Sequence, residues 1–278
     1  MAPSTRLPWR QLVKLIFSET TPDYSHYLYP YVVWAVPEAA ETPDQFFAAG
    51  FLPAAPDLSR FYLCRQIRIV LANFSLSSEN RRILRKGTGI RCQLVPRHQF
   101  DYNAARRGFF KDYADQKFGK DVMTWERLDL LFQSRVVSHL LVFNDEKSGA
   151  EIGVVVLFLQ EPAIAFYYYG FYDLAYADRN LGMYMMTSAV EFFSGLSYRH
   201  VHLGTCYSEK ALYKTQFTGM EFFNGFRWSQ NLDELKFLVR RNNPAAHLLQ
   251  TGEFTTLFYG DDLGHIIDSS GFQLPPPL

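Results

Sequence analysis

The sequence predicts a mixed α/β fold of the α+β class, in which helices pack on a largely antiparallel sheet. Two observations lead to this prediction. Three runs rich in β-branched and aromatic residues, at 139–145, 151–160 and 164–172, follow one another with only turns between them, as in an antiparallel meander. Between residues 181 and 228, patterns typical of helices and of strands then alternate.

The first 125 residues contain the same mixture of elements. The run "DQFFAAGFL" (44–52) predicts a helix that Gly50 ends, and a loop with two prolines follows it. The run 61–74 has alternating apolar positions at Ile67, Ile69 and Leu71, which is typical of a strand. A helix and a strand are therefore expected before residue 75.

The next three elements are expected to be a helix, a strand and a helical region. Residues 75–87 predict a helix with a serine cap at its start and a glycine at its end. The segment 90–96 has the pattern of a strand. The stretch 101–137 is helical in pattern, apart from an interruption near "FGKD".

The order of elements after the meander indicates a particular kind of unit. The expected elements are a helix at 181–196, a strand at 200–204, a helix at 207–218 and a strand at 221–228. Three antiparallel strands followed by this order are typical of an N-acetyltransferase-like (GNAT) unit, and the first half of the chain is interpreted as a degenerate copy. The predicted division is an N-terminal GNAT-like half at 1–125, a C-terminal GNAT-like transferase half at 126–241 and a C-terminal appendage at 242–278.

The composition narrows the class of protein. The formal net charge is zero, so contact with nucleic acid would require a local basic patch. The three cysteines, Cys64, Cys92 and Cys206, form no CxxC pair, which excludes a four-cysteine metal site built by this chain alone. The longest apolar runs are too short to span a bilayer. We therefore expect a cytoplasmic protein with no membrane partner and no bound metal.

The loop that opens the helix at 181–196 has the sequence "RNLGMY" (179–184). In acetyl-CoA enzymes the loop at this position reads R/Q-x-x-G-x-G/A, and its backbone N–H groups hold a pyrophosphate at the helix N-terminus. Arg179 and Gly182 fit this pattern, whereas Tyr184 occupies a position where a small residue would let the backbone approach a phosphate. The alternative interpretation is a charged loop residue, a glycine at a helix start and a tyrosine of the core.

Two segments carry a more specific pattern. "LSSENRRILRKG" (76–87) is similar to P-S-x-S-Q-R-R-V-L-R-R, and the segment 181–228 is similar to L-G-T-Y, Y-x-x-L-G-Y, K-M-x-Y-K-x-x-F and G-x-W in turn. The matching residues are Ser77, Arg81, Arg82, Leu84, Arg85, Lys86, Leu181, Gly182, Tyr184, Leu203, Gly204, Lys210, Tyr213, Lys214, Phe217 and Trp228. In this order and spacing, residues 46–230 resemble the arginyl- and leucyl-tRNA–protein transferases.

The resemblance implies a GNAT-like fold and an aminoacyltransferase reaction. An aminoacyl group, arginyl or leucyl, would move from charged tRNA to the N-terminal α-amine of an acceptor protein. The best-known acceptors of this family begin with Asp or Glu, and the product is marked for degradation through an N-degron pathway. The implied partners are charged tRNA and a protein N-terminus, with no further cofactor.

The chain also departs from the family pattern. The family has N-terminal cysteines in C-x-Y-L-P or C-x-x-C arrangements, whereas "YSHYLYPY" (24–31) has none and only Cys64 matches a later cysteine group. The segment from Gly204 to Lys214 is about two residues shorter than in the family. We therefore expect a divergent member that lacks a metal or cluster site.

A binding site for the tRNA donor is expected on the basic helix and the loop at 179–184. Lysine and arginine suit the phosphates of an acceptor stem, and aromatic rings suit its unpaired bases. On the helix, two columns of cations form at i,i+4 spacing, with a solvated basic face as the alternative. The predicted donor-binding residues are Arg81, Arg82, Arg85, Lys86, Arg179, Gly182 and Tyr184.

The segment 203–223 is expected to border the site of transfer. On the predicted helix at 207–218, helical spacing puts Tyr207, Lys210 and Lys214 on one face. Such a face could hold a phosphate or an acceptor carboxylate, and an ordinary surface face is the alternative. The predicted rim of the site consists of Gly204, Tyr207, Lys210, Tyr213 and Lys214.

Asp173 and Tyr168 are the predicted catalytic residues. An aminoacyl-tRNA is an activated ester, so the reaction needs a neutral amine placed at the carbonyl and a stabilised oxyanion. Asp173 follows a strand, where it could orient the amine or act as a base, or could only cap a turn. Strand alternation puts Tyr168 opposite Tyr167 and Tyr169, with core packing as the alternative.

Two other functions are open on the sequence alone. One is a GNAT acyltransferase that uses acyl-CoA, such as acetyl-CoA, which Tyr184 and the basic helix argue against. The other is a non-catalytic module that binds RNA or acidic protein ends, which the missing cysteines and the shortened segment leave open.

Overall fold

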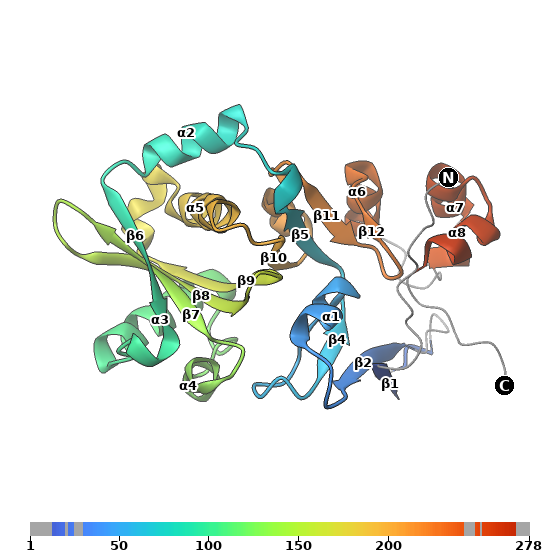
Figure 1. Ribbon diagram of the computed structural model, residues 1–278, viewed down its shortest axis with the longest axis horizontal. Helices are drawn as coiled ribbons and strands as arrows, with labels where there is room; N and C mark the ends of the chain where they lie inside the picture. Colours follow the sequence, from blue (N-terminus) through green and yellow to red (C-terminus); the bar gives the residue numbers. More distant parts are fainter. Residues whose placement is uncertain (1–12, 20–21, 25–29, 242–247, 251, 271–278) are drawn as a thin grey trace.

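The computed structural model describes residues 13–19, 22–24, 30–241, 248–250 and 252–270, and it contains two sheets (Figure 1). The larger sheet has eight strands in the order β12 (Trp228–Ser229), β11 (Met220–Phe223), β5 (Gln66–Val70), β10 (His200–Thr205), β9 (Ile164–Tyr172), β8 (Glu151–Gln160), β7 (His139–Asp145) and β6 (Ile90–Pro96). The smaller sheet has four, in the order β1 (Val13–Glu19), β2 (Tyr31–Pro37), β4 (Phe61–Leu63) and β3 (Phe51–Pro53). The predicted mixed α/β class is confirmed.

The antiparallel meander of β7, β8 and β9 forms the centre of the large sheet, as predicted. Strand β7 pairs with β8, and β8 pairs with β9, both antiparallel. The run Val154–Leu157 of β8 is buried because both faces of the sheet are covered. A rigid platform of this kind holds the strand ends that form the candidate site.

The segment 61–74, expected as one strand, is divided between the two sheets. Strand β4 belongs to the small sheet, β5 belongs to the large one, and residues Leu71–Asn73 form the short 3₁₀ helix η1. The chain crosses from one sheet to the other at Cys64 and Arg65. The alternation of Ile67 and Ile69 correctly marked β5, but alternation does not reveal which neighbour a strand will pair with.

The expected division at residue 125 does not follow the sheets. Strand β5 lies between β11 and β10, and β6 pairs with β7 at the opposite edge. Both strands come from the first 125 residues but complete the sheet built by the second half. The N-terminal segment therefore does not form a separate copy of the same unit.

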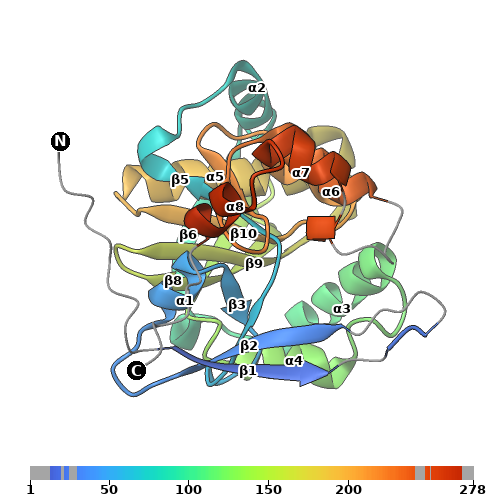
Figure 2. The same cartoon turned by 90° about the vertical axis from the view of Figure 1, so that its right-hand side faces the viewer.

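Helices cover both faces of the large sheet (Figures 1 and 2). On one face lie α2 (Ser78–Lys86) and α5 (Leu181–Gly195), and on the other lie α3 (Ala104–Phe118) and α4 (Trp125–Gln133). Helix α2 begins and ends as predicted, because the Ser77 hydroxyl accepts a hydrogen bond from the Asn80 N–H and Gly87 is the C-cap.

The small sheet packs under the large one, beside α3 and α4 (Figure 2). Helix α1 (Pro43–Ala48), which ends near Gly50 as predicted, contributes the fully buried Phe46 and Phe47 to this contact. The Phe47 ring packs against Phe158 and Phe166 of the large sheet, and the Phe46 ring stacks on Phe61 of β4. The N-terminal segment is thus fixed next to the start of β9.

Of the appendage predicted at 242–278, the structure describes residues 248–250 and 252–270, and their Phe254, Tyr259 and Ile266 are packed into the core. The remaining residues of the predicted appendage lie outside the described part of the chain. Helices α6 (Leu232–Arg240), α7 (Gly252–Tyr259) and α8 (Leu263–Ser269) follow a two-strand ending, β11 and β12, where one strand was expected. Short 3₁₀ helices lie at Arg97–Gln99 (η2), Leu174–Arg179 (η3), Glu209–Thr215 (η4) and Leu248–Gln250 (η5). Among the residues that the structure describes, no helix is long and apolar enough to cross a membrane.

Candidate functional site

A cavity of about 860 Å³ opens where β9 and β10 separate. The two strands are parallel neighbours, and their pairing ends after three positions, at His202 and Phe166. Beyond this point β9 continues with Tyr167–Tyr172 and β10 with Leu203–Thr205, and most of these residues line the cavity. Splitting a sheet exposes unpaired backbone groups and side chains of both strands, so the position is suited to binding a ligand.

A β-bulge in each strand lies at the point of separation. In β9, Tyr169 and Tyr167 pair with Val156 and Leu157, which leaves Tyr168 as the additional residue. In β10, the register shifts between His202 and Gly204. A bulge bends its strand and changes the direction of the side chains. The expected strict alternation of Tyr167, Tyr168 and Tyr169 is therefore wrong, and all three line the cavity.

Tyrosine rings form much of the cavity wall. Tyr167 is buried, and Tyr168, Tyr169 and Tyr172 of the same strand are half-buried. Burial raises the pKa of Tyr168 to about 12 and raises the pKa of Tyr167 further. The hydroxyls of Tyr167 and Tyr168 are therefore neutral at physiological pH, where they can donate hydrogen bonds but do not act as bases.

The small sheet supplies a wall that the sequence did not indicate. Trp34 of β2 lies opposite Tyr62 of β4, which in turn lies opposite Leu52 of β3, and all three line the cavity. Burial raises the pKa of the Tyr62 hydroxyl well above its usual value. No local motif marks these residues, because they reach the site only through the packing of one sheet on the other.

The N-terminus of α5 faces the same cavity. Asn180, Gly182 and Met183 line it, and no side chain caps the helix at Asn180, whose φ is 54°. Gly182 packs closely on Tyr172, because a Cβ at this position would lie 2.7 Å from the phenolic oxygen. Gly182 thus lies at the cavity, and its predicted role in binding the donor stays a prediction.

Two cations line the cavity, Lys214 of η4 and Arg127 of α4. The Lys214 Nζ donates a hydrogen bond to the Thr205 carbonyl at 2.9 Å, and burial lowers the pKa of this amine. Arg127 Nη1 donates to the Val122 carbonyl at 3.0 Å. The cavity lining, taken over the part of the chain that the structure describes, contains no Asp or Glu. The only charged side chains that an anionic group would meet in this described lining are therefore positive.

The predicted helix at 207–218 is instead the short 3₁₀ helix η4, and this changes which residues share a face. Tyr213 and Lys214 line the cavity, as does the nearby Gly204. Lys210 is exposed outside it. The Tyr207 hydroxyl accepts a hydrogen bond from the Arg65 N–H at 2.8 Å, and the Arg65 guanidinium lies over the Tyr207 ring. A 3₁₀ helix has three residues per turn, so the spacing expected for an α-helix does not apply.

Asp173 lies at the end of β9 but does not line the cavity. Its carboxylate accepts a hydrogen bond from the Ala175 N–H at 2.8 Å and so caps the 3₁₀ helix η3. This is the turn-capping role left open by the sequence. A base at this position is not supported by the geometry.

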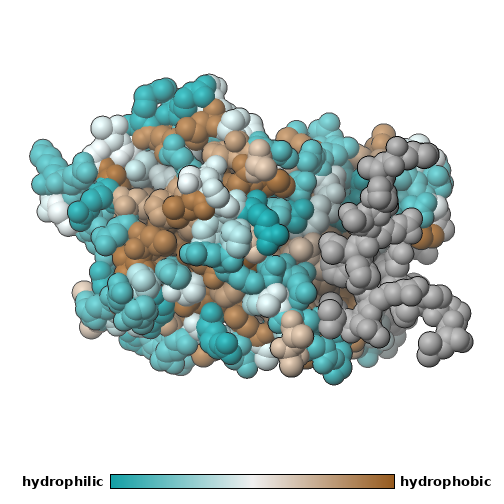
Figure 3. Space-filling model, viewed as in Figure 1, coloured by the Kyte–Doolittle hydropathy of each residue, from teal (hydrophilic) through white to brown (hydrophobic). Residues whose placement is uncertain are grey.

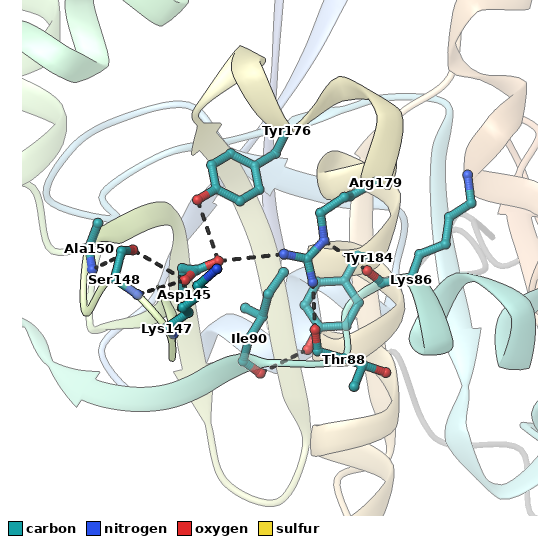
Figure 4. A network of polar contacts seen from close by, with 10 residues as sticks. All are labelled: Lys86, Thr88, Ile90, Asp145, Lys147, Ser148, Ala150, Tyr176, Arg179 and Tyr184. Atoms are coloured by element: carbon teal, nitrogen blue, oxygen red, sulfur yellow. Dashed lines mark hydrogen bonds and ion pairs between the residues drawn. The ribbon is translucent and has the colours of Figure 1, made fainter.

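Arg179 and Tyr184 hold α2 against the start of α5 (Figure 4). Arg179 donates to the Lys86 carbonyl at 3.0 Å and to the Thr88 carbonyl at 2.6 Å, and lies 3.5 Å from the Asp145 carboxylate. The Tyr184 hydroxyl donates to the buried carbonyl of Ile90 at 3.3 Å. The Tyr184 ring occupies the space that a side chain at residue 87 would need. Both residues therefore join structural elements, and the donor-binding role predicted for them is corrected.

The cations of α2 lie on the outer surface, away from the cavity lining (Figure 3, top). Arg82 pairs with Glu79, and Arg81 donates to the Leu76 carbonyl at 2.5 Å. Lys86 donates to the Asp178 carbonyl at 3.2 Å, and Arg85 is exposed. The helix presents a basic face on the α5 side of the molecule.

The cysteines take no part in the cavity. Cys206 is fully buried, and desolvation raises the pKa of its thiol. Burial also raises the pKa of Cys64 and of Cys92 to about 12. The residues that the structure describes contain no group of three or more His, Cys, Asp or Glu side chains arranged to hold a metal ion.

No family model matches the sequence. The chain has distant homologues named aspartate/glutamate leucyltransferase. The protein of Methylobacterium sp. (strain 4-46) is 25% identical over 182 residues, which cover 60% of this chain and 72% of the relative. The protein of Pseudoalteromonas atlantica (strain T6c) is 22% identical over 244 residues, which cover 81% of this chain and 93% of the relative.

Solved structures overlap with about half of the chain. The C-terminal domain of a protein described as a lysylphosphatidylglycerol synthetase from Agrobacterium fabrum has a TM-score of 0.42 at 15% identity, with 55% of this chain and 49% of that chain covered. L-PGS from Bacillus licheniformis has a TM-score of 0.38 at 10% identity, with 51% and 46% covered. Overlaps of this size do not define a fold.

Proposed function

We propose that this protein is an aminoacyl-tRNA–protein transferase, which moves an aminoacyl group from charged tRNA to the N-terminal α-amine of an acceptor protein. The observation that carries the proposal is the cavity between β9 and β10, because five of the motif residues meet in its lining, namely Gly182, Leu203, Gly204, Tyr213 and Lys214. These residues come from separate parts of the second motif block. The distant relatives named leucyltransferases support the same reaction class.

The proposed reaction makes limited chemical demands on the protein. The acceptor nitrogen attacks the ester carbonyl of the aminoacyl-tRNA, a C–N bond forms, the C–O bond to the ribose breaks, and a proton of the amine passes to the released ribose oxygen. The cavity holds neutral phenols, cations and a helix N-terminus, but its lining in the described residues holds no carboxylate or histidine. Catalysis is therefore proposed to come from positioning and from hydrogen-bond donation to the oxyanion.

Tyr168 is the proposed donor of such a hydrogen bond. It is the additional residue of the β9 bulge, and it lines the cavity. Because burial raises its pKa to about 12, its hydroxyl stays protonated at neutral pH and can donate a hydrogen bond to the oxyanion. Of the two residues predicted to be catalytic, we therefore keep Tyr168 of β9 and not Asp173, which follows this strand.

The acceptor is proposed to begin with Asp or Glu. Lys214 and Arg127 both line the cavity, and no acidic side chain of the described lining neutralises them. A partly desolvated ammonium group gains more from an anionic partner than an exposed one does, because water screens it less. The name of the distant relatives, aspartate/glutamate leucyltransferase, supports this acceptor and favours a leucyl over an arginyl group.

The tRNA is proposed to lie along the α2 side of the molecule, with its 3′ end in the cavity. Arg81, Arg82, Arg85 and Lys86 would contact the phosphates of the acceptor stem. Rings of the cavity wall, such as Trp34 and Tyr62, are available to stack on unpaired bases. The modified protein would then be a substrate for degradation in the cytoplasm.

The test is a transfer assay with purified protein, pools of charged tRNA carrying labelled amino acids, and peptides that begin with Asp, Glu, Asn or Ala. We expect label on the peptides that begin with Asp or Glu. A parallel reaction supplies labelled acetyl-CoA with the same peptides. Transfer from acetyl-CoA alone would contradict the proposal, and transfer from neither donor would indicate a non-catalytic binding module.

A further inference from the structure

A second, smaller pocket of about 260 Å³ adjoins the cavity. The two share five lining residues, so they are adjacent and have a common wall. The shared residues are Pro53, Ala54, Arg127, Tyr168 and Tyr169. We call the smaller space the side pocket. Pro53 ends β3 and Ala54 follows it, Tyr168 and Tyr169 belong to the β9 bulge, and Arg127 belongs to α4.

The inner part of the side pocket is apolar and buried. Met123, Leu131 and Val136 line it with exposed fractions of 2%, 7% and 3%. Pro56 and Leu130 add apolar surface at its outer edge, where Leu130 is 50% exposed. A volume of 260 Å³ is below the range of whole-ligand sites but has room for one amino-acid side chain.

The charges around the side pocket discriminate between classes of side chain. Its lining in the described residues contains no Asp or Glu, and its one charged residue is Arg127, at the junction with the main cavity. A guanidinium or ammonium group placed there would lose water without gaining an anionic partner and would be repelled by Arg127. An aliphatic side chain would instead gain by leaving water.

The side pocket is also unsuited to the acidic side chain of an acceptor. A carboxylate that entered it would be surrounded by Met123, Leu131 and Val136, and the second cation, Lys214, lines only the main cavity. In the proposed reaction the acceptor nitrogen bonds to the carbonyl carbon of the donor. The side chains of donor and acceptor therefore extend away from this carbon in different directions. The main cavity suits the acidic side chain of the acceptor, and the side pocket suits the side chain of the transferred amino acid.

We propose that the side pocket binds the side chain of the transferred amino acid and selects an aliphatic side chain over a basic one. This inference rests on the proposed function and identifies the class of donor. Residues around the pocket, Ala55 and Ser134 in particular, then set the size of the accepted side chain, since both line the side pocket but not the main cavity.

The test uses donors that cannot react, so that it does not depend on transfer. The probes are 3′-amino-3′-deoxyadenosine carrying leucine, alanine or arginine in amide linkage, and their dissociation constants are measured by calorimetry. We expect the leucyl probe to bind at least tenfold more tightly than the arginyl probe. Ala55→Leu should weaken the leucyl probe about tenfold or more and leave the smaller alanyl probe within twofold.

The matched control is Ala72→Leu, which adds the same atoms at an exposed position outside both pockets. It should leave all three dissociation constants within twofold. Ser134→Leu fills the same pocket from the C-cap of α4, and it is used if Ala55→Leu does not fold. The proposal is overturned if the arginyl probe binds as tightly as the leucyl probe, if no probe binds, or if both filling variants leave the leucyl constant within twofold.

Charged tRNA in a parallel transfer assay separates the two proposals. If the leucyl probe is preferred but no peptide acquires leucine, the side pocket stands as a binding site and the proposed function fails. If peptides acquire an amino acid while Ala55→Leu changes neither probe binding nor donor preference, the proposed function stands and the side pocket assignment fails.

Discussion

Lys214 and Lys210 lie on the same short helix, η4, yet their surroundings differ. Lys214 lines the cavity and donates to the Thr205 carbonyl, whereas Lys210 is exposed outside it. The motif pattern included both lysines and did not distinguish them. Only the 3₁₀ geometry of η4 and the bend of β10 at Gly204, where φ is 79°, place one of them beside the cavity.

Replacing Lys214 should selectively impair the use of acidic acceptors. Lys214→Met keeps the length of the side chain and removes its charge, so we expect kcat/KM for a peptide beginning with Asp to fall about 10- to 100-fold, the range for one lost hydrogen bond to a charged group. For a peptide beginning with Asn the fall should be smaller. Lys210→Met is the matched control and should stay within twofold. An equal loss with both peptides would mean that Lys214 does not recognise the acceptor carboxylate.

At the scale of elements, predictability depended on whether the signals were local. The cap at Ser77, the glycine after α2 and the periodicity of the meander are local signals, and these elements were predicted correctly. The two bulges that open the cavity were not predicted, because a bulge depends on the register with a neighbouring strand. For the same reason Trp34, Tyr62 and Arg127 were missed, since each reaches the site from an element that carries no motif.

Helix α2 should contribute to RNA binding through charge alone. Arg85→Glu changes a cation that forms no ion pair within the described part of the chain, and we expect weaker binding of tRNA. The slope of log Kobs against log salt concentration should become shallower by about one, as for one lost phosphate contact. The measurement is a salt titration by filter binding. Lys147→Glu, on the exposed turn between β7 and β8, is the matched control, and an equal effect of both changes would argue against a specific surface on α2.

At the scale of the whole molecule, the C-terminal helices are joined to the large sheet by a buried polar network. The carboxyl of Glu234 accepts hydrogen bonds from Asn224 Nδ2 at 2.8 Å, Ser229 Oγ at 2.6 Å and the Tyr259 hydroxyl at 3.0 Å. Phe254 of α7 is fully buried in the same core. The turn-rich composition after residue 241 predicted an appendage. This prediction missed the contribution of Phe254 and Tyr259 to the core, because composition does not show which distant residues a side chain will contact.

Removing one donor from this network should lower the stability of the whole protein. Tyr259→Phe leaves Glu234 with one hydrogen bond fewer in a buried site, so we expect the free energy of unfolding to fall by about 1–3 kcal/mol. Urea denaturation measures the change. Tyr31→Phe removes a hydroxyl from a ring that is 57% exposed and should change the free energy of unfolding by less than about 0.5 kcal/mol. If both variants are equally stable, the network does not hold the C-terminal helices in place.

Two histidines of β10 should make the protein sensitive to mild acid. Burial and the neighbouring Arg68 lower the pKa of His200 to about 4, and burial lowers the pKa of the fully buried His202 well below its usual value of 6.5. Among the groups facing His200, Arg199 favours the neutral form, whereas Glu221 and the hydrogen bond with the backbone of Ala163 favour the charged form without reversing the shift. Both rings are therefore neutral in the folded protein at pH 5, where histidines of the unfolded chain are protonated.

The direction of the pH effect follows from the number of bound protons. Between pH 6.5 and about 4 the unfolded chain binds more protons than the folded protein, so stability falls as the pH is lowered through this range. Urea midpoints at pH 7, 6 and 5 should therefore decrease for the native protein. His200→Asn should lose less stability between pH 7 and 5, and the exposed control His98→Asn should follow the native protein. An identical pH dependence of all three proteins would show that His200 does not couple folding to protonation, and the buried His202 would then have to be tested in its place.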